Sequence, residues 1–228
     1  MTEAERARVS VIIPAKNEAT TLADVIAGVK PYCSELIVVD GRSRDDTREV
    51  ATGLGARVLV DDGRGKGAAI RLGAREATRE ILVFIDADGS HDPDDVPRVA
   101  GPVLAGEFDL VIGSRRRGGS DELHSSFFEF IRLMGSEIIG LVINYRFGLR
   151  LTDYQNGLRA IRRDVMNGLG TSQNSFTIEQ EMSLKCIKRG FRLGEVPAHE
   201  YRRKAGVSNL VVWKVGWLWI WSLFKELW

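Results

Sequence analysis

The order of hydrophobic and polar positions in the first half of the chain predicts strands and helices that alternate. Apolar runs rich in β-branched residues read as buried strands at residues 9–13, 35–40, 56–60, 81–86 and 109–113. Helical patterns follow Glu18, Asp46, Lys66 and Asp94. Strands joined by helices in this way lie mostly parallel, so the sequence predicts an α/β fold, a mostly parallel sheet flanked by helices.

The second half of the chain departs from this alternation. An apolar-rich stretch covers residues 127–147, and strand patterns at 157–162 and 191–196 flank a helical pattern at 178–188. No low-complexity linker divides the 228 residues, which are enough to bury one large core. We therefore expect one domain over residues 1–209, followed by an apolar segment at 210–228.

The fourth predicted strand ends in two carboxylates separated by one residue, Asp86 and Asp88. In extended backbone both point to the same side, at the edge where open α/β sheets bind ligands. Two such oxygens suit Mg²⁺ or Mn²⁺, whose open positions can take phosphate oxygens. An Asp-rich turn that caps the next helix explains the same residues equally well, so this segment alone leaves both interpretations open.

Carboxylates also follow the first two predicted strands, as Glu18 and Asp40. One acidic residue at such a position is usually a helix cap. In a doubly wound sheet, however, these ends and the Asp86/Asp88 pair meet in one crevice, which would be costly without a bound cation or a hydroxyl-rich ligand. Convergence favours a nucleotide-sugar pocket.

The glycine-rich segment 63–67 precedes a helix but fits neither of two nucleotide motifs. Lys66 is followed by Gly67 rather than Ser or Thr, which excludes a Walker A loop, and the glycines follow the third strand rather than the first, which excludes a dinucleotide fingerprint. Two interpretations remain. Lys66 approaches a phosphate or a base at a helix amino terminus, or the segment is a turn with a solvated lysine.

Charge and cysteine content narrow the function further. The net charge of +1 argues against a general nucleic-acid binder. Cys33 and Cys186 match no metal spacing, and residues 1–6 carry no apolar signal region. We expect a protein of the reducing cytoplasm.

Taken in order, the motifs resemble those of family 2 glycosyltransferases of the GT-A fold. They are VSVIIPAKNE, ELIVVDGRSRDDT, GKGAAIRLGAREA, ILVFIDADGSHDP, DLVIGSR and a D-x-x-x-G-x-R-A-x-R block. The likeness runs from Val9 to about Leu210 and is strongest to the branch with dolichol-phosphate mannose synthase and bacterial polyprenyl-phosphate sugar transferases. It implies that a hexose passes, with inversion, from a UDP- or GDP-sugar to a polyprenyl phosphate, with Mg²⁺ or Mn²⁺ as cofactor.

The resemblance assigns roles in the nucleotide-sugar half, up to about residue 115. The loops after the first two strands would line the base and ribose pocket, and the fourth strand would serve the metal and the diphosphate. By position, the nucleotide-sugar residues are Pro14, Asn17, Glu18, Asp40, Lys66, Asp86 and Asp88, and the metal residues are Asp86, Asp88 and Ser90.

In the acceptor half, about residues 116–209, the resemblance points to basic side chains. Arg115 would face the acceptor phosphate, and Asp153 and Arg159 belong to the D-x-x-x-G block. Residues 202–210 resemble a basic lid that closes over the diphosphate, although a solvated basic loop is the alternative for its first three residues. The lid residues are Arg202, Arg203, Lys204 and Ser208.

The chain departs from the family pattern at positions that matter for binding. Ala15 replaces the usual aromatic residue, so stacking on the base must come from elsewhere or be weaker, and Gly41-Arg42 replaces a further acidic residue. Ser90 replaces a glutamine and is a poorer metal ligand, and Asn209 replaces the lid lysine.

The catalytic residues depend on the acceptor. Asp88 and Arg115 would suffice for a phosphate, which is already ionised, whereas a hydroxyl acceptor needs a base. Glu179 and Glu181 are the candidates for this alternative enzyme, although acids also favour the first turn of a helix for its dipole. A non-catalytic nucleotide-sugar binding protein is a different class.

All 5 tryptophans lie after residue 210, among apolar residues flanked by Lys214 and Lys225. The uninterrupted apolar part is short against the roughly 20 residues that span a bilayer. An interfacial helix, peripheral on the cytoplasmic face of a membrane, fits this pattern. A helix that docks on the domain or on a second copy in an oligomer is the alternative.

Overall fold

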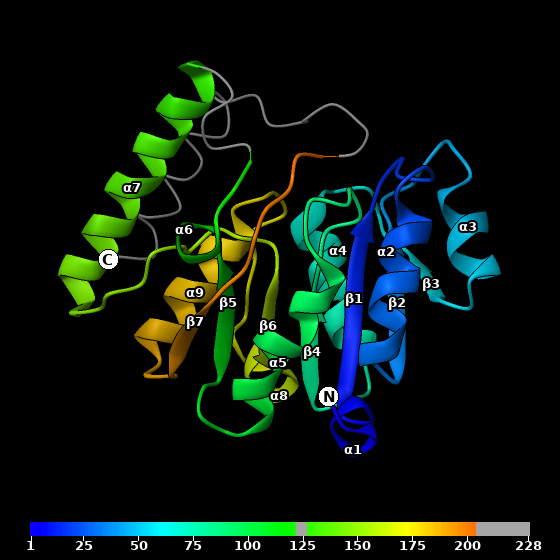
Figure 1. Cartoon of the computed structure of the whole chain (residues 1–228), viewed down its shortest axis with the longest axis horizontal. Coiled ribbons are helices and arrows are strands. Elements are labelled where there is room, and N and C mark those ends of the chain that lie inside the picture. Colours follow the sequence, from blue (N-terminus) through cyan, green and yellow to red (C-terminus); the bar gives the residue numbers. More distant parts are fainter. Residues whose placement is uncertain (122–126, 204–228) are drawn as a thin grey trace.

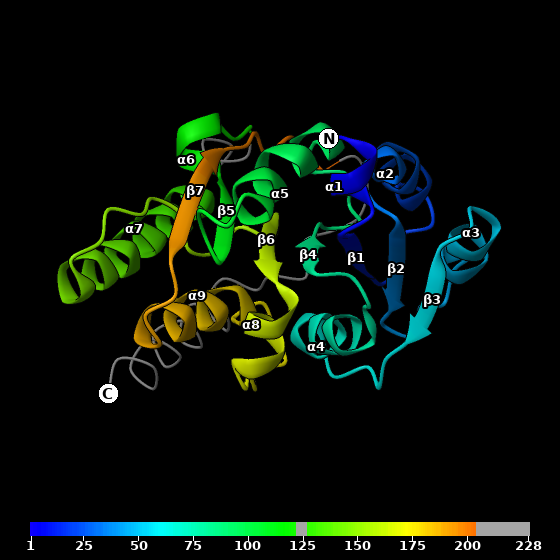
Figure 2. The ribbon, with the colours of Figure 1, turned by 90° about the horizontal axis from the view of Figure 1, so that it is seen from below.

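The fold is built on one sheet with helices on both faces, as Figure 1 and Figure 2 show for residues 1–121 and 127–203, which the computed structural model describes. In these residues the sheet has seven strands in the order β3-β2-β1-β4-β6-β5-β7. Only β6 runs antiparallel to its neighbours. The strands are β1 (Val9–Ala15), β2 (Glu35–Asp40), β3 (Arg57–Val60), β4 (Ile81–Phe84), β5 (Leu110–Ser114), β6 (Arg159–Arg162) and β7 (Leu193–Pro197).

The helices cover the sheet in two layers, each with its own apolar cluster. The layer of α2 (Leu22–Val29), α3 (Thr47–Gly53) and α5 (Val96–Leu104) packs on one face. The layer of α4 (Lys66–Glu76), α8 (Arg163–Gly168) and α9 (Ile178–Lys188) packs on the other, as the edge-on view of Figure 2 makes clear. Short helices complete the described chain as α1 (Glu3–Arg6), η1 (Lys30–Tyr32), η2 (Pro93–Asp95) and α6 (Arg115–Gly118).

The helix α7 (Phe127–Phe147) lies outside the two layers, at the end of the sheet opposite to β3 (Figure 1). Its buried residues Ile139 and Ile143 form a third apolar cluster with Tyr154 and Leu184, which joins α7 to α9. No described helix is both long enough and apolar enough to cross a bilayer.

The α/β fold with a mostly parallel sheet is confirmed, and each predicted strand lies within two residues of an observed one at both ends. What the pattern did not predict is the place of β6, which inserts antiparallel between β4 and β5. The predicted apolar helix at 210–228 lies outside the described residues.

One close approach holds the nucleotide-side helix against the sheet. A Cβ atom on Gly73 of α4 would lie 2.5 Å from Ile12 Cγ2 in β1 and 3.1 Å from Val39 Cγ2 in β2. Both neighbours are fully buried, so neither can move aside cheaply. Gly73 therefore sets how closely α4, and Lys66 at its start, can lie to the strands.

We expect Gly73→Ala to lower the free energy of unfolding by about 1–3 kcal/mol, because overpacking outweighs the gain in helix propensity. Gly101→Ala in α5 is the matched control, since nothing lies within 4 Å of its Cβ position. That variant should gain about 0.5–1 kcal/mol. Urea denaturation measures both, and equal shifts of the two variants would contradict the close approach.

Candidate functional site

A cavity of about 390 Å³ opens where β1, β2, β3 and β4 end. The loop after each of these strands contributes to its wall, together with the start of α4 and two residues from the second half of the chain. The lining residues are Pro14, Ala15, Lys16, Asn17, Glu18, Gly41, Asp61, Gly63, Gly65, Lys66, Ala69, Asp86, Ala87, Asp88, Phe176 and Arg203.

The cavity thus brings together seven of the residues that the sequence singled out: Pro14, Asn17, Glu18, Lys66, Asp86, Asp88 and Arg203. Asp40 lies behind the wall instead. Its side chain is fully buried and accepts hydrogen bonds of 3.2 Å from the backbone N–H of Ser43. Asp40 therefore shapes the loop after β2, whose Gly41 reaches the cavity.

Backbone in the left-handed region preshapes this part of the rim. Asn17 and Arg42 have φ values of 57° and 60°, which residues other than glycine rarely adopt. Asn17 also ties the two loops together, because its N–H donates to Ser43 Oγ and its Oδ1 accepts from Arg44 N–H, both at 2.8 Å.

A buried triad of charges forms the floor at the end of β4. Lys66 Nζ lies 2.5 Å from Asp86 Oδ1 and 2.8 Å from Glu179 Oε1. Burial alone would lower the pKa of Lys66 and raise that of Asp86, but their mutual attraction outweighs it and keeps both charged. His91 Nε2 lies 3.7 Å from Asp86 Oδ2 on the other side.

Gly157, from the predicted D-x-x-x-G block, makes room for this triad. A Cβ atom there would lie 2.5 Å from Asp86 Oδ2. The glycine of the block is therefore explained by the space that the carboxylate needs.

Asp88 also lines the cavity, and its side chain is 8% exposed. Its Oδ1 accepts hydrogen bonds from Ser90 N–H at 3.0 Å and from Ser90 Oγ at 2.6 Å, and its Oδ2 lies 3.2 Å from Arg203 Nε. Burial and the charge of Asp88 raise the pKa of Glu18 nearby. Negative charge thus concentrates at this point of the wall.

The donor set fits a metal ion only if a ligand completes it. Within residues 1–121 and 127–203, no three His, Cys, Asp or Glu side chains cluster in a way that could hold an ion. The carboxylate of Asp86 is already paired with Lys66. Asp88 is oriented by its hydrogen bonds from Ser90, so it is the carboxylate best placed to bind an ion once Arg203 moves away from it. Mg²⁺ commonly binds through one or two carboxylates, waters and substrate phosphates, which suits this site.

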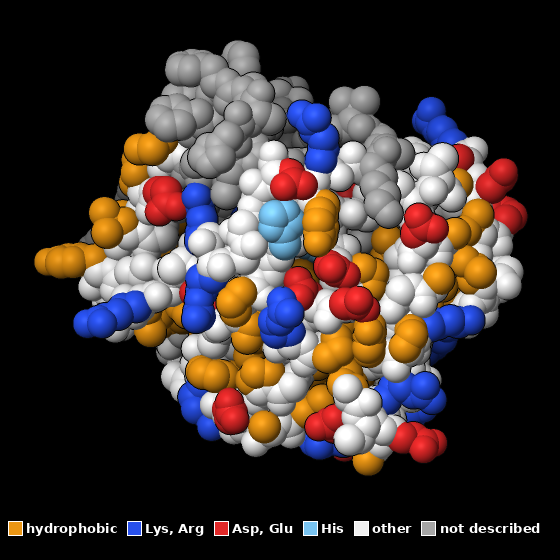
Figure 3. Space-filling model, viewed as in Figure 1, with side chains coloured by type: hydrophobic (Ala, Val, Ile, Leu, Met, Phe, Trp, Pro, Cys, Tyr) orange, Lys and Arg blue, Asp and Glu red, His pale blue; other side chains and the backbone are white. Residues whose placement is uncertain are grey.

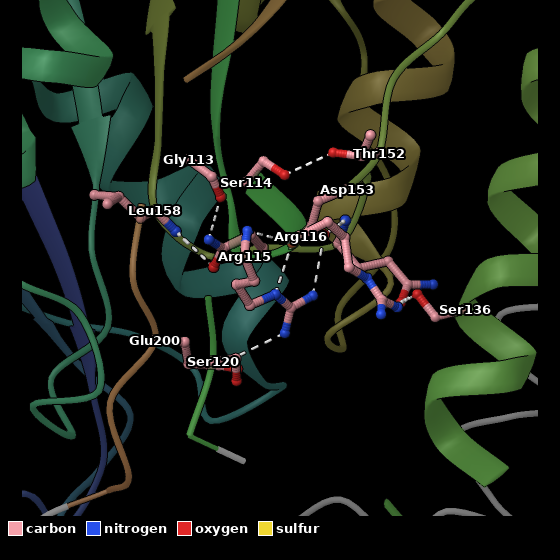
Figure 4. Close-up of polar contacts among 12 residues, drawn as sticks. Gly113, Ser114, Arg115, Arg116, Ser120, Ser136, Thr152, Asp153, Leu158 and Glu200 are labelled. Atoms are coloured by element: carbon pink, nitrogen blue, oxygen red, sulfur yellow. Dashed lines mark hydrogen bonds and ion pairs between the residues drawn. The ribbon is translucent and has the colours of Figure 1, made fainter. Parts of the chain in front are cut away.

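Arg115 lies in a second network, shown in Figure 4. Its Nε and Nη2 donate to the two oxygens of Asp153 at 2.7 and 3.0 Å, and its Nη1 lies 3.2 Å from Glu200 Oε1. Burial alone would raise the pKa of Asp153, but the charge and hydrogen bonds of Arg115 outweigh it and lower the pKa. Arg115 therefore fixes loop structure, and its side chain keeps 19% exposure.

Arg159 and Glu181 are among the predicted functional residues that lie in the interior and do not line the cavity. Arg159 has no exposed surface and donates to the carbonyl oxygens of Tyr154, Asn156 and Glu179. Direct contact with an acceptor or a diphosphate, as predicted, is not open to a side chain in this position. Its donors satisfy the carbonyl groups of Tyr154 and Asn156, which no helix or strand would satisfy, and also reach the first turn of α9.

Glu181 is equally enclosed. Its oxygens accept from the backbone N–H groups of Ser172 and Gln173 at 2.9 to 3.0 Å and pair with Lys185 at 2.8 Å. A role as catalytic base is not open to it in this position. Glu179 is 2% exposed and lies behind Lys66. One of its oxygens, Oε2, has no hydrogen-bond partner among residues 1–121 and 127–203.

The predicted lid is described only in part. Arg202 is exposed, and Arg203 lines the cavity. Lys204 and Ser208 lie outside the described residues.

The sequence reasoning missed Asp61 and Phe176, which bring a carboxylate and an aromatic ring to the cavity wall. Asp61 follows β3, as the other acidic residues follow their strands, and that position could have revealed it. Phe176 comes from the second half of the chain. The one indication in the sequence was that position 15 is alanine, which implied that an aromatic side chain for the pocket had to come from elsewhere.

A crevice of this kind, at the carboxyl ends of parallel strands and walled by carboxylates and a buried lysine, defines a nucleotide-binding α/β enzyme class. Residues 10–170 match the sequence profile of glycosyl transferase family 2. The chain belongs to this family, and the prediction that it is a glycosyltransferase is confirmed.

Similar proteins agree with this. Glycosyltransferase AglJ of Haloferax volcanii is 32% identical over 200 residues, which are 87% of this chain and 64% of that protein. Polyprenol monophosphomannose synthase of Mycolicibacterium smegmatis is 31% identical over 221 residues, 89% of this chain and 81% of that one. A crystal structure of glucosyl-3-phosphoglycerate synthase from Mycobacterium tuberculosis with Mn²⁺, UDP and glucosyl-3-phosphoglycerate is 25% identical, with a TM-score of 0.76 and coverage of 98% and 82%.

The Arg115–Asp153 pair predicts a pH-dependent stability. We expect Asp153→Asn to lower the free energy of unfolding by about 3–5 kcal/mol at pH 7, because Arg115 loses its buried partner. The folded pKa of Asp153 lies below its ordinary 3.8, so its stabilising effect is complete above about pH 5 and disappears as the pH falls through the folded pKa. Urea denaturation of both proteins from pH 7 to pH 3 should show the difference shrinking in acid.

Asp164→Asn is the control, since Asp164 pairs with Arg162 at the surface with 64% exposure. Its loss should cost less than about 1 kcal/mol. A loss as large for Asp164 as for Asp153 would contradict the assignment.

Proposed function

We propose that this chain is an inverting, metal-dependent glycosyltransferase that moves a hexose from a nucleoside-diphosphate sugar to a polyprenyl phosphate. The observation that carries the proposal is the cavity itself, in which the Lys66–Asp86 pair and Asp88 meet at the end of β4. The neighbour crystallised with Mn²⁺ and UDP supports a nucleotide donor and a divalent cation in general.

In this proposal the donor lies with its base and ribose at the ends of β1 and β2 and its diphosphate at the end of β4. Pro14 and Asn17, with Gly41 after β2, leave a partly apolar space for the base and ribose. The diphosphate then lies by Asp88, Lys66 and Arg203. A Mg²⁺ or Mn²⁺ ion held by Asp88 would supply positive charge for the phosphates when bound. Arg203, released from Asp88, is within the same wall and can neutralise the departing nucleotide.

A phosphate acceptor suits the carboxylates that are present. Its oxygen is ionised at neutral pH and attacks C1 of the sugar from the face opposite to the leaving nucleotide, which inverts the anomeric centre. No base is needed for this attack. Of the two base candidates, Glu181 is tied to the loop before α9 and Glu179 to Lys66. The relative named polyprenol monophosphomannose synthase supports a lipid phosphate.

A hydroxyl acceptor is the second candidate. The neighbour bound to glucosyl-3-phosphoglycerate favours it, and Glu179 is then the base. This reaction would require Glu179 to leave Lys66 and to become accessible from the cavity.

The outer face of α7 supports a lipid acceptor. Met134, Ile138, Leu141 and Tyr145 recur every three to four residues and are 44%, 58%, 69% and 92% exposed. Figure 3 shows hydrophobic side chains at that edge of the molecule, over α7. Such a row suits contact with the surface of a membrane, where polyprenyl chains lie. In this proposal residues 210–228 add a second contact, and the enzyme is peripheral on the cytoplasmic face.

The first test measures transfer. Radiolabelled UDP- and GDP-hexoses are incubated with extracted polyprenyl phosphate and Mg²⁺ or Mn²⁺, and the label in the organic phase is counted. We expect Asp88→Asn to lower kcat/KM by about 10²-fold or more, because charge at the leaving diphosphate is no longer balanced. Asp94→Asn, an exposed carboxylate on the same segment, is the control. Transfer at the wild-type rate by Asp88→Asn would refute the metal role.

The second test addresses the lipid. We expect the double variant Ile138→Asp, Leu141→Asp to lose most transfer to polyprenyl phosphate in liposomes, because charged side chains resist burial at the interface, while it binds the donor normally. Val60→Asp, an equally exposed apolar position on β3, is the control and should keep its activity. Unchanged transfer by the double variant would remove α7 from the acceptor route.

A further inference from the structure

An aromatic side chain lines the donor cavity at a position that none of the sequence motifs covers. Phe176 lies in the loop before α9, and its ring is half-buried in the cavity wall. Lys66 Nζ lies 5.7 Å from the centre of the ring. The wall formed by residues 14–18 contains no aromatic side chain, since position 15 is alanine.

The loop that carries Phe176 is held from several sides. Gly67 N–H donates to Asn174 O at 2.9 Å, and Arg71 donates to Gln173 O and to Asn174 Oδ1. Glu181 accepts the N–H groups of Ser172 and Gln173 from below. These contacts place the ring before any ligand arrives, so little ordering is required on binding.

The sheet order indicates which part of a donor would meet this ring. The base and ribose space lies at the ends of β1 and β2, and the diphosphate position lies at the end of β4. Phe176 lies beside Lys66, whose ammonium reaches Asp86 after β4 and Glu179 on α9. If the diphosphate of the donor lies beside Lys66 and Asp88, as proposed, the sugar attached to it is the part that comes next to Phe176.

The chemistry of the ring suits a sugar. One face of a hexose carries several C–H bonds and few hydroxyls, and these polarised hydrogens pack well against the negative face of an aromatic ring. Binding pockets for small molecules commonly combine such an apolar platform with a few placed polar groups, which Lys66 and Asp86 provide here.

We propose that Phe176 is the platform on which the hexosyl group of the donor stacks, and that it contributes to the choice of sugar. This inference rests on the proposed function, because it needs a nucleoside-diphosphate sugar in the cavity. Glu181 acts only as a positioning residue, through the loop that it holds.

Isothermal titration of UDP, UDP-glucose, GDP and GDP-mannose, each with Mn²⁺, tests the stacking role of Phe176 separately from the proposed binding of a nucleotide sugar. Phe176→Ala should weaken binding of the preferred nucleotide sugar about tenfold relative to wild type, while the affinity for the matching nucleoside diphosphate stays within twofold. Phe176→Tyr, which keeps the ring, should bind like wild type. Phe176→Leu keeps apolar bulk without the ring and should bind the sugar conjugate as weakly as Phe176→Ala does.

Lys16→Ala is the control at the nucleotide end, and it should change both affinities together. Melting temperatures check that each variant is folded, and Phe176→Leu replaces Phe176→Ala in the comparison if the latter is not. If Phe176→Ala lost equal affinity for the nucleotide and for its sugar conjugate, or lost affinity for neither, Phe176 would not be the platform for the sugar. The assignment of the cavity to the donor would still stand. Wild-type protein that binds none of the four ligands would overturn the proposed function and the platform with it.

Discussion

The site depends on the contact between Lys66, Asp86 and Glu179. Three charges in a largely buried position are tolerable only because the ammonium lies within 2.8 Å of both carboxylates. The contact joins the start of α4, the end of β4 and the start of α9, three elements that are far apart in the chain. Glycines allow it from two directions, since Gly73 brings α4 close to the sheet and Gly157 leaves space for Asp86. With one ammonium against two carboxylates, this part of the cavity wall has a fixed shape and a net negative charge before a ligand binds.

The triad also explains why the two aspartates at the end of β4 differ. Asp86 is paired with Lys66, so its charge supports the structure of the cavity wall. Asp88 is paired instead with Arg203, which comes from the last described part of the chain. In the proposed donor complex, Asp88 would hold the cation and Arg203 would reach the phosphates. Each of the two side chains would exchange one charged partner for another, so neither charge would stay buried without a partner.

Much of the nucleotide half could be predicted because its signals are local. Apolar runs define β1, β2 and β4, and polar residues directly after a parallel strand must appear at one edge of the sheet. The order of the sheet beyond β4 is different in kind. The antiparallel β6 between β4 and β5 results from contacts between residues some 50 to 80 positions apart, and no local pattern records them. The α7 stretch was also ambiguous, since Ile139 is buried whereas Ile138 beside it is exposed.

The interior positions of Arg159 and Glu181 have a common physical cause. Arg159 and Glu181 belong to residue types that are common in catalytic sites. The sequence alone does not distinguish a charged side chain that contacts a ligand from one that makes hydrogen bonds to the backbone. Both stand beside irregular segments, around residues 154–157 and 170–176, whose carbonyl and N–H groups need partners that no helix or strand provides. A charged side chain makes strong hydrogen bonds to several such groups at once, and this is how the fold uses Arg159 and Glu181.

This use of carboxylates bears on the choice of acceptor. With Glu181 fixed on the loop of Phe176 and Glu179 fixed on Lys66, taking a proton at either group would break a contact that shapes the cavity. An acceptor that brings its own negative charge avoids this conflict, because it needs orientation and not deprotonation. A lipid phosphate satisfies that condition, and the exposed apolar row of α7 offers a surface along which its chain can lie. In the proposed donor complex Phe176 would then serve the sugar alone, since no proton transfer would have to take place beside its ring.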